Sequence, residues 1–362
     1  MAENKKDEKN PLPEQLEAIK AEKNTVVAAG AGSGKTTVLS LRFLNLVKEH
    51  NLNVDEILTL TFTKKATVEL SDRIHKVLKN DAPDQAAKLY TANIKTLDSY
   101  CNSVAKLGCR FYGISPDFVQ DDEAVSKAVS DKALPFLLKN RDNPVIKYFV
   151  DVHDYSSVAN SLFVEPILEC SKIAQPVDFK KDLANQYERI SQMWNETTDK
   201  IGEKLQWMWN LENDFDGNAS AKFWLKYLEI KKNYSIPENL KITAEMVADG
   251  SAIKLVNKYT KDILVFSFQK PGNSKFSLAD DYREAIDEIK NLSASLYPYC
   301  DYIEGVSFVQ EVIPLMEEFQ DMVMDVKRTT NCLTFKDVSH LALCILRDYP
   351  EIRALEKKKY KV

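Results

Sequence analysis

A glycine-rich segment near the start of this 362-residue chain constrains the fold more than any other feature. It follows the apolar run Thr25–Ala29 and ends in Gly34-Lys35-Thr36. Glycines let successive backbone N–H groups curl round a phosphate chain, and a helix that starts at the loop adds further donors. The segment therefore predicts a nucleotide-binding loop between a buried strand, 25–29, and a helix, 34–49. A glycine-rich turn without a ligand is the alternative.

Strand and helix patterns alternate after the loop. Residues 56–62 and 93–96 have the composition of strands, whereas residues 64–80 and 97–107 have helical periodicity. The apolar face of the first of these helices consists of Leu70, Ile74, Val77 and Leu78. Such alternation is typical of a parallel sheet with helical crossovers. We therefore predict an α/β region over residues 1–115.

The pattern changes after Pro116. Residues 116–330 have mainly helical periodicity, interrupted by scattered proline and glycine, and they carry an excess of acidic residues within a chain of net charge −5. The four tryptophans of the chain fall in this region, at Trp194, Trp207, Trp209 and Trp224. We expect them to pack in a helical core, with stacking on nucleic-acid bases as the alternative.

Regular patterning returns near the carboxyl end. Thr334 and Asp337 have the spacing of a helix cap. The apolar face of the helix that follows consists of Val338, Leu341, Ala342 and Ile345. Pro350 is expected to end that helix, and residues 360–362 resemble the start of a strand.

Composition limits the cellular setting. No apolar run is long enough to cross a membrane, and the charged amino terminus lacks the apolar stretch of a secretory signal. The six cysteines form no Cys-x-x-Cys pair, which disfavours a zinc site or a disulfide framework. We therefore expect a protein of the reducing cytoplasm with no membrane partner.

The surroundings of the loop resemble the UvrD/Rep-type superfamily 1 DNA helicases. Residues 12–19 look like the Q motif of that family, in which Gln15 would select ATP because an amide matches the N6/N7 edge of adenine. An exposed glutamine on a helix is the alternative. The resemblance implies ATP and Mg²⁺ as cofactors, with Lys35 and Thr36 as catalytic residues and the Thr36 hydroxyl as the metal ligand. It implies nucleotide contacts from Gln15, Ala29, Gly30, Ala31, Gly32, Ser33, Gly34, Lys35, Thr36 and Thr37.

Two further segments resemble the DNA-contacting motifs of the same family. Thr61–Leu70 is similar to motif Ia, with Lys64 in place of the usual asparagine. Ile94–Cys101 looks like the next motif, with Asp98 in place of a histidine, which removes a neutral or cationic contact to phosphate. The resemblance implies single-stranded or duplex DNA as a partner. The predicted DNA contacts are Phe62, Thr63, Lys64, Lys65, Thr96, Asp98, Ser99 and Tyr100.

The resemblance also implies an architecture. An incomplete RecA-like parallel sheet with helices, subdomain 1A, would comprise residues 1–115 and 331–362, and an inserted helical subdomain, 1B, would comprise residues 116–330. The insertion is long, and Thr37 replaces a common arginine. Both features favour the helicase–nuclease branch that includes AddA and RecB, and hence a helicase–nuclease partner subunit.

The next family motif, an apolar strand followed by Asp-Glu-x-x-Asp, does not occur in the sequence. We therefore expect the amino-terminal part of a DNA repair or recombination helicase, which by itself neither hydrolyses ATP efficiently nor unwinds DNA. Two alternatives remain open. One is a helical module that binds DNA or a partner without catalysis. The other is a small-molecule kinase with a phosphate loop, although a kinase would leave Thr61–Leu70 unexplained.

Overall fold

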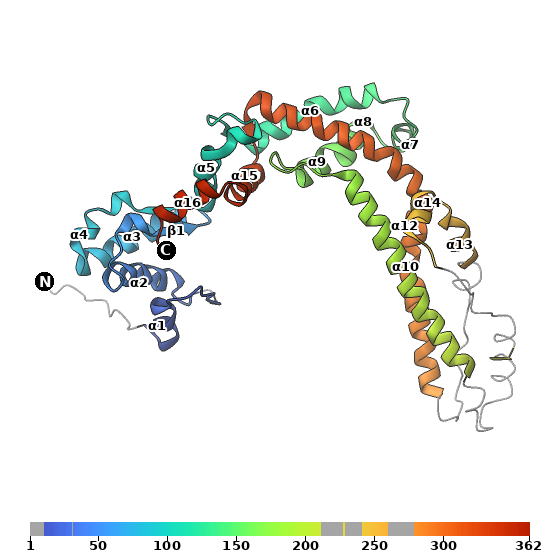
Figure 1. The fold of residues 1–362 in the computed structure, drawn as a ribbon, viewed down its shortest axis with the longest axis horizontal. Helices are drawn as coiled ribbons and strands as arrows, with labels where there is room; N and C mark the ends of the chain where they lie inside the picture. Colours follow the sequence, from blue (N-terminus) through green and yellow to red (C-terminus); the bar gives the residue numbers. More distant parts are fainter. Residues whose placement is uncertain (1–10, 31, 211–226, 229–240, 260–278) are drawn as a thin grey trace. The chain divides into compact units, whose positions relative to one another are not determined.

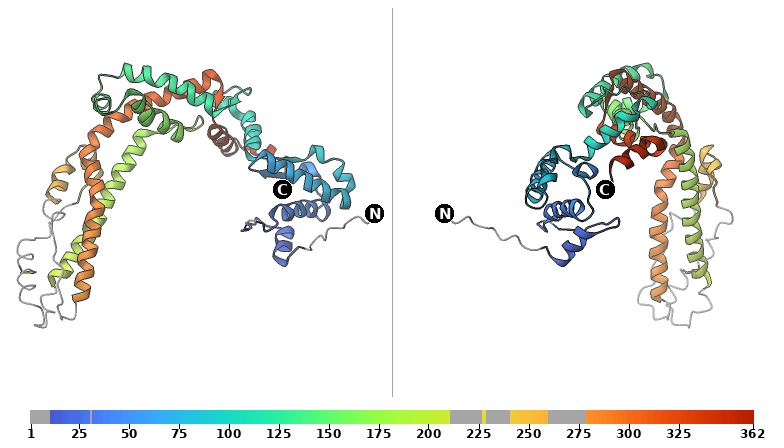
Figure 2. Two further views of the ribbon diagram at one scale, coloured as in Figure 1. Left: turned by 180° about the vertical axis from the view of Figure 1, so that it is seen from behind. Right: turned by 60° about the vertical axis from the view of Figure 1, so that its left-hand side comes forward.

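A computed structural model describes residues 11–30, 32–210, 227–228, 241–259 and 279–362 (Figure 1, Figure 2). The chain divides into two units. Unit 1 consists of Met1–Lys132, Leu168–Pro176 and Met322–Val362, and unit 2 consists of Ala133–Ile167 and Val177–Asp321. Three helices contribute residues to both units, namely α6 (Asp122–Lys139), α9 (Glu165–Cys170) and α14 (Ala279–Thr330).

Unit 1 contains helices and two small parallel sheets. Its remaining elements are α1 (Pro13–Lys20), α2 (Lys35–Lys48), η1 (Val54–Glu56), β1 (Leu58–Thr61), α3 (Lys64–Asp81), α4 (Pro83–Ala86), η2 (Leu89–Thr91), β2 (Asn93–Thr96), α5 (Leu97–Gly108), η3 (Cys109–Tyr112), β3 (Val119–Gln120), β4 (Cys332–Leu333), α15 (Phe335–Asp348) and α16 (Pro350–Lys359). The helices predicted over 34–49, 64–80 and 97–107 and the strand over 93–96 are confirmed, and β1 lies within the predicted 56–62.

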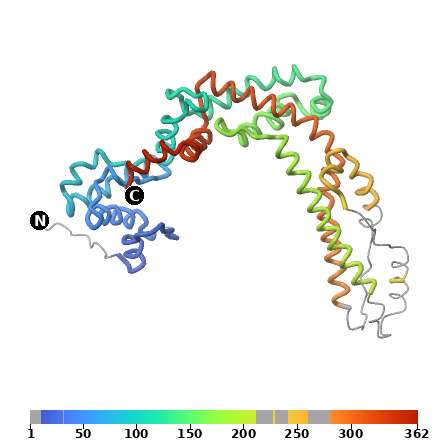
Figure 3. Tube along the Cα trace, in the orientation of Figure 1, coloured from blue at the N-terminus to red at the C-terminus, as the bar shows by residue number. Residues whose placement is uncertain are grey.

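The strands β1 and β2 pair in parallel over four residues each, from Leu58 opposite Asn93 to Thr61 opposite Thr96. The last residues of the chain lie along the other edge of β1 (Figure 3). There the Leu58 N–H donates to the Val362 carbonyl at 2.8 Å, which supports the predicted start of a strand at 360–362. The chain is therefore extended on both sides of β1.

The strand predicted at Thr25–Ala29 is wrong. These residues have no regular secondary structure, and the Val26 and Val27 side chains are 97% and 57% exposed. A strand needs a neighbour that satisfies its backbone groups and covers its faces. Both edges of β1 are occupied by β2 and the chain end, so the segment has no strand beside it in the described part of unit 1.

The two cores of unit 1 follow the predicted apolar faces. Leu70, Ile74 and Leu78 of α3 are buried against Phe43 and Val47 of α2 and their neighbours, whereas Val77 is only partly buried. The second core packs α5 against α15. The four predicted core residues of α15, Val338, Leu341, Ala342 and Ile345, all lie in it.

Local capping sets the ends of α15. The Thr334 hydroxyl accepts from the Asp337 N–H at 3.0 Å, and the Asp337 carboxylate accepts from the Thr334 N–H at 3.1 Å, so the predicted cap is confirmed. The helix ends at Asp348, as Pro350 predicts, but α16 begins at that proline, which suits the first turn of a helix. The short pairing of β3 with β4 was not predicted.

Unit 2 is helical in its described residues. Its further elements are α7 (Pro144–Val152), α8 (Tyr155–Ala159), η4 (Asn160–Val164), α10 (Phe179–Asn210), α12 (Ala244–Ala248) and α13 (Ala252–Tyr259). Helices α10 and α14 run side by side, with an ion pair between Lys204 and Glu288. The mainly helical character predicted after Pro116 is thus confirmed for these residues.

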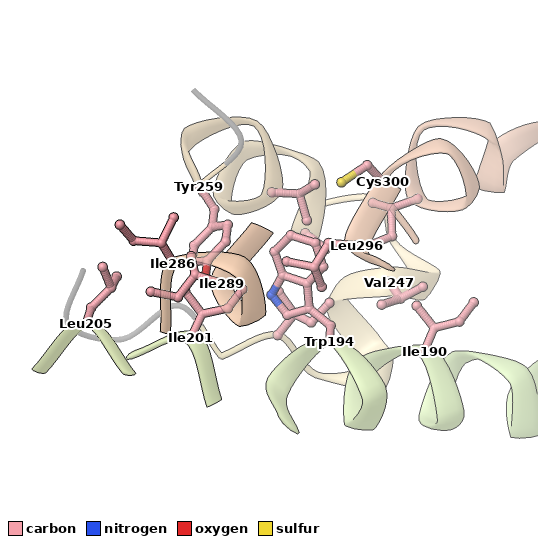
Figure 4. Close-up of a cluster of buried hydrophobic side chains, with 14 of the residues drawn as sticks. Ile190, Trp194, Ile201, Leu205, Val247, Tyr259, Ile286, Ile289, Leu296 and Cys300 are labelled. Carbon is pink, nitrogen blue, oxygen red and sulfur yellow. The ribbon is translucent and has the colours of Figure 1, made fainter. Parts of the chain in front are cut away.

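The tryptophans of unit 2 differ in their surroundings. Trp194 is fully buried between α10, α12, α13 and α14, with its ring 5.5 Å from that of Tyr259 in an edge-on arrangement (Figure 4). Trp209 packs against the same core, whereas Trp207 is 37% exposed. Trp224 lies outside the described residues. Core packing is therefore confirmed for Trp194 and Trp209, and it is wrong for Trp207.

Candidate nucleotide and nucleic-acid site

The glycine-rich loop joins the extended segment 21–30 to α2. Gly32 and Gly34 have φ angles of +76° and +80°, a region that side chains with a Cβ rarely adopt. Gly34 precedes Lys35, the first residue of α2, so the loop ends at a helix amino terminus. Ala31 lies outside the described residues. The backbone therefore turns at the glycines that the motif requires.

Gln15 connects α1 to this loop. Its Nε2 donates to the Ser33 carbonyl at 3.0 Å, and its Oε1 accepts from the Leu12 N–H at 2.9 Å. A carboxamide has two N–H groups and two acceptor lone pairs. These two bonds use one of each, so one N–H and one lone pair of Gln15 are left by them.

Lys35 is turned back onto the loop. Its ammonium donates to the Ala29 carbonyl at 3.1 Å and to the Gly30 carbonyl at 2.7 Å. The Gly30 carbonyl also accepts from the Ser33 hydroxyl at 2.9 Å. The loop carbonyls are thus satisfied by the loop's own side chains, and the Lys35 ammonium stands within the curl of the backbone.

Two threonines follow Lys35 in the first turn of α2. Thr36 is half-buried. The hydroxyl of Thr37 accepts a long hydrogen bond of 3.4 Å from Arg73 on α3. The described residues contain no group of three or more His, Cys, Asp or Glu side chains arranged to hold a metal ion.

A pocket of about 510 Å³ opens between α1, the loop and α2. Gln15, Ala29, Gly30, Ser33 and Lys35, half of the ten predicted nucleotide contacts, line it together with Leu12, Glu14, Ala18, Val27, Ala28, Val38, Leu39 and Arg42. Its size suits a small ligand. Sequence reasoning missed Arg42, whose guanidinium reaches the end of α1. A lone arginine between apolar residues of a helix was the available signal.

The two predicted DNA-contacting segments meet at one edge of unit 1. Thr61 and Thr96, the last residues of β1 and β2, pair directly, so Phe62–Lys65 and Leu97–Tyr100 leave the sheet side by side. Strands that run in parallel bring their carboxyl ends to the same edge. The fold therefore brings together segments that are about 35 residues apart in sequence.

The side chains at this edge differ in exposure. Phe62 is 88% exposed, and Lys64 and Lys65 are exposed in the first turn of α3. Thr63 and Thr96 cap α3 and α5, because their hydroxyls accept from the Ala66 and Ser99 N–H groups. The edge thus presents an aromatic ring, two ammonium groups and two helix amino termini.

The remaining residues of the second segment are less open. Ser99 is exposed, but Asp98 and Tyr100 are half-buried. The Tyr100 ring lies edge-on to that of Tyr360 at 6.2 Å. Burial, followed by the hydrogen-bonded Glu356 carboxylate, raises the pKa of Tyr100 well above its usual range. Tyr100 therefore stays neutral and is partly engaged by the chain end.

A glycine-rich loop at a helix start, beside a parallel strand pair in a helix-rich chain, places this protein with helical proteins built on small parallel sheets. The chain belongs to the family of the UvrD/REP helicase N-terminal domain, whose model matches residues 12–362. The predicted family is confirmed. No helix among the described residues combines the length and apolar character needed to span a bilayer.

Curated relatives agree with the helicase–nuclease branch predicted from the sequence. Over 96% of its length, the chain is 26% identical to an ATP-dependent helicase/nuclease protein of Streptococcus suis (strain 98HAH33). It is 25% identical to the protein of the same name from Clostridium beijerinckii over 93%, and 24% identical to that from Staphylococcus haemolyticus over 90%. The chain spans about a third of each relative, namely 32%, 30% and 29% of their lengths.

Proposed function

We propose that this chain is the ATP- and DNA-binding front part of an ATP-dependent DNA helicase that acts in DNA repair or recombination. The observation that carries the proposal is the pairing of Thr61 with Thr96, which puts both DNA-contacting segments at one edge of the unit that also holds the phosphate loop. A motor needs both functions in one body, because nucleotide state must change the grip on DNA.

In the proposed nucleotide site, Gln15 reads adenine. The N–H and lone pair left by its bonds to Ser33 and Leu12 match the acceptor N7 and the donor N6 amino group of adenine. Guanine presents two acceptors on the same edge, so it would leave the Gln15 lone pair opposed by another. The selection of ATP over GTP follows from that difference.

The loop residues hold the phosphates. Backbone N–H groups of Gly30–Thr36 and the start of α2 would surround them, Ala29 would border them, and Thr37 would flank them in the same turn. Lys35 would leave the Ala29 and Gly30 carbonyls for the β- and γ-phosphates, a charge-assisted exchange. The Thr36 hydroxyl would be the one protein ligand here for Mg²⁺, which is supplied with the nucleotide and neutralises phosphate charge.

In the proposed DNA site, Phe62 stacks on a base, and Lys64 and Lys65 contact phosphates. Thr63, Thr96 and Ser99 add hydroxyl contacts, as does the Tyr100 phenol. Asp98 borders the strand without a cationic contact. Stacking suits an unpaired base, which favours single-stranded DNA as the direct ligand.

We also propose the subdomain assignment predicted from the sequence. The RecA-like subdomain 1A would comprise residues 1–115 and 331–362, and the inserted subdomain 1B residues 116–330. Two observations support it: residues from both ends of the chain lie in unit 1, and the described residues of unit 2 are helical.

Two further proposals concern the setting. The relatives are named as one subunit of an ATP-dependent helicase/nuclease, which supports a helicase–nuclease partner subunit for this chain. All six cysteines are free thiols, which supports the reducing cytoplasm.

The test measures both ligands on one protein. Titration with Mg·ATP and with a fluorescein-labelled oligothymidine should each show saturable binding. Lys35→Ala should weaken ATP by about tenfold or more, the order expected for a charge-assisted contact, and leave the DNA affinity unchanged. Lys48→Ala, on the same helix but outside the pocket, should change neither affinity. Nucleotide binding that does not depend on Lys35 would contradict the proposed site.

A further inference from the structure

Arg42 of α2 reaches the carboxyl end of α1. Its Nη1 lies 3.1 Å from the Ala18 carbonyl, 3.4 Å from that of Ile19 and 2.9 Å from that of Ala21. Helix α1 ends at Lys20, so these are carbonyls of its last turn and its cap residue. The last four carbonyls of a helix have no partner within the helix, and the guanidinium satisfies them.

The contact matters because α1 has little else to hold it. The helix has eight residues, and Ile19 is its one buried residue. A cation at a helix carboxyl terminus also interacts favourably with the helix dipole. At the other end of α1, Gln15 is bonded to the Ser33 carbonyl of the loop. Helix α1 is thus tied to the loop by Gln15 and to α2 by Arg42.

The position of Gln15 against the loop leaves little room for error. A Cβ atom built on Gly34 would lie 3.4 Å from Gln15 Nε2, so the amide already packs closely over the loop. A carboxamide that pairs with a base edge must be placed to within a fraction of an ångström. A shift of α1 along its axis would carry the amide away from that position.

We propose that Arg42 is a positioning residue for nucleotide selection: by anchoring the end of α1, it fixes the Gln15 amide where it discriminates adenine from guanine. The proposal rests on the proposed ATP site and adds the residue that sets its specificity. Arg42 lines the same pocket as Gln15 and Lys35, but it acts through Gln15.

The experiment compares ATP with GTP binding, because a merely structural residue would weaken both nucleotides alike. Affinities for both are measured with the full chain, as wild type, Arg42→Met and Arg42→Lys. Arg42→Met should lower the ATP-to-GTP affinity ratio by about tenfold, the effect of one misplaced hydrogen bond to a base. Arg42→Lys keeps one cationic donor and should lower the ratio by about threefold. It decides the matter if the methionine variant fails to fold.

Two controls sharpen the result. Lys48→Met removes a cation from the same helix, where it pairs with Asp81 at 3.5 Å, and should leave the ratio unchanged. Gln15→Ala should lower the ratio as Arg42→Met does, and the double variant should lower it no further, since the two residues act in series.

Three outcomes would count against the inference. An unchanged ratio in both Arg42 variants would overturn it while leaving the ATP site intact, and so would an additional loss of selectivity in the double variant. A wild-type chain that binds ATP and GTP equally would instead overturn the proposed role of Gln15, and the inference with it.

Discussion

Thr61 and Thr96 face each other in the parallel pairing of β1 and β2, and each is the last residue of its strand. The backbone after each threonine therefore leaves the sheet at one edge, where two helices begin. Thr63 and Thr96 cap those helices with hydroxyl groups. The pairing explains how two short segments, separated by a whole helix in sequence, can contact one ligand.

The exposed ring of Phe62 gives a first prediction. Phe62→Ala should weaken the binding of oligothymidine by about tenfold, because a stacked base contributes on the order of 1–3 kcal/mol. Fluorescence anisotropy at fixed salt measures the effect. Tyr90→Ala is the matched control, because Tyr90 is 87% exposed and precedes β2 at its opposite end. Equal losses in the two variants would argue against a base-stacking role for Phe62.

The two lysines at the start of α3 predict a salt effect. Lys64→Gln with Lys65→Gln should reduce the slope of log affinity against log salt by about 1.4, since each phosphate contact to a single strand contributes about 0.7. The control is Lys76→Gln with Lys79→Gln, which removes the same charge from exposed positions further along α3. If both pairs lower the slope equally, the charge acts at long range and not through contact.

The buried ion pair of unit 1 predicts a loss of stability that a second substitution reverses. Lys327 Nζ lies 2.9 Å from Asp337 Oδ2, and both side chains are fully buried. Lys327→Met leaves a buried carboxylate without its cation, which costs about 3–5 kcal/mol. Adding Asp337→Asn removes the charge and should restore much of that loss, while the amide oxygen still accepts from Thr334 or Ile173.

Thermal melting followed by circular dichroism provides the measurement. Lys139→Met is the reference, because its exposed pair with Glu318 should contribute less than about 1 kcal/mol. A double variant that melts lower than Lys327→Met alone would show that hydrogen bonding, and not the unpaired charge, sets the cost.

His340 predicts a dependence of stability on pH. Burial, followed by the charges of Arg347 and Lys172, lowers the pKa of His340 below its ordinary value of 6.5. Below pH 6.5 the unfolded chain therefore takes up a proton more readily than the folded chain. The stability that His340 contributes is present above this pH and is lost as the pH falls through the lowered pKa.

The test compares wild type with His340→Gln between pH 8 and pH 5. Over that range the wild-type melting temperature should fall further than that of the glutamine variant. The contact of His340 Nδ1 with the Cys344 thiol, at 3.5 Å, is lost at every pH and should shift the two curves by a constant amount. Parallel curves would show that His340 titrates normally.

Local signals predicted much of unit 1 correctly. The caps at Thr63, Thr96 and Thr334 depend on a hydroxyl and an N–H group two or three residues further on, so sequence spacing contains them completely. The apolar faces of α3 and α15 depend on helical periodicity, which is equally local. For the same reason the glycines of the phosphate loop could be placed from the sequence.

Partners distant in sequence decided the rest. The apolar run Thr25–Ala29 has the composition of a strand, but pairing depends on which edges other segments already occupy, and at β1 the chain end and β2 occupy both. The anchoring of α1 by Arg42 joins residues more than twenty positions apart. Composition marks an arginine among apolar neighbours without indicating what it contacts.

The sequence by itself therefore determined the family, the phosphate loop and the helix starts around it, because these depend on residue types at short, regular spacing. Only the tertiary structure decided that Thr61 and Thr96 share one edge, that Lys327 and Asp337 are buried together, and that Arg42 holds the helix of Gln15. Each of these contacts joins segments whose separation along the chain carries no periodic signal, so it is settled by packing alone.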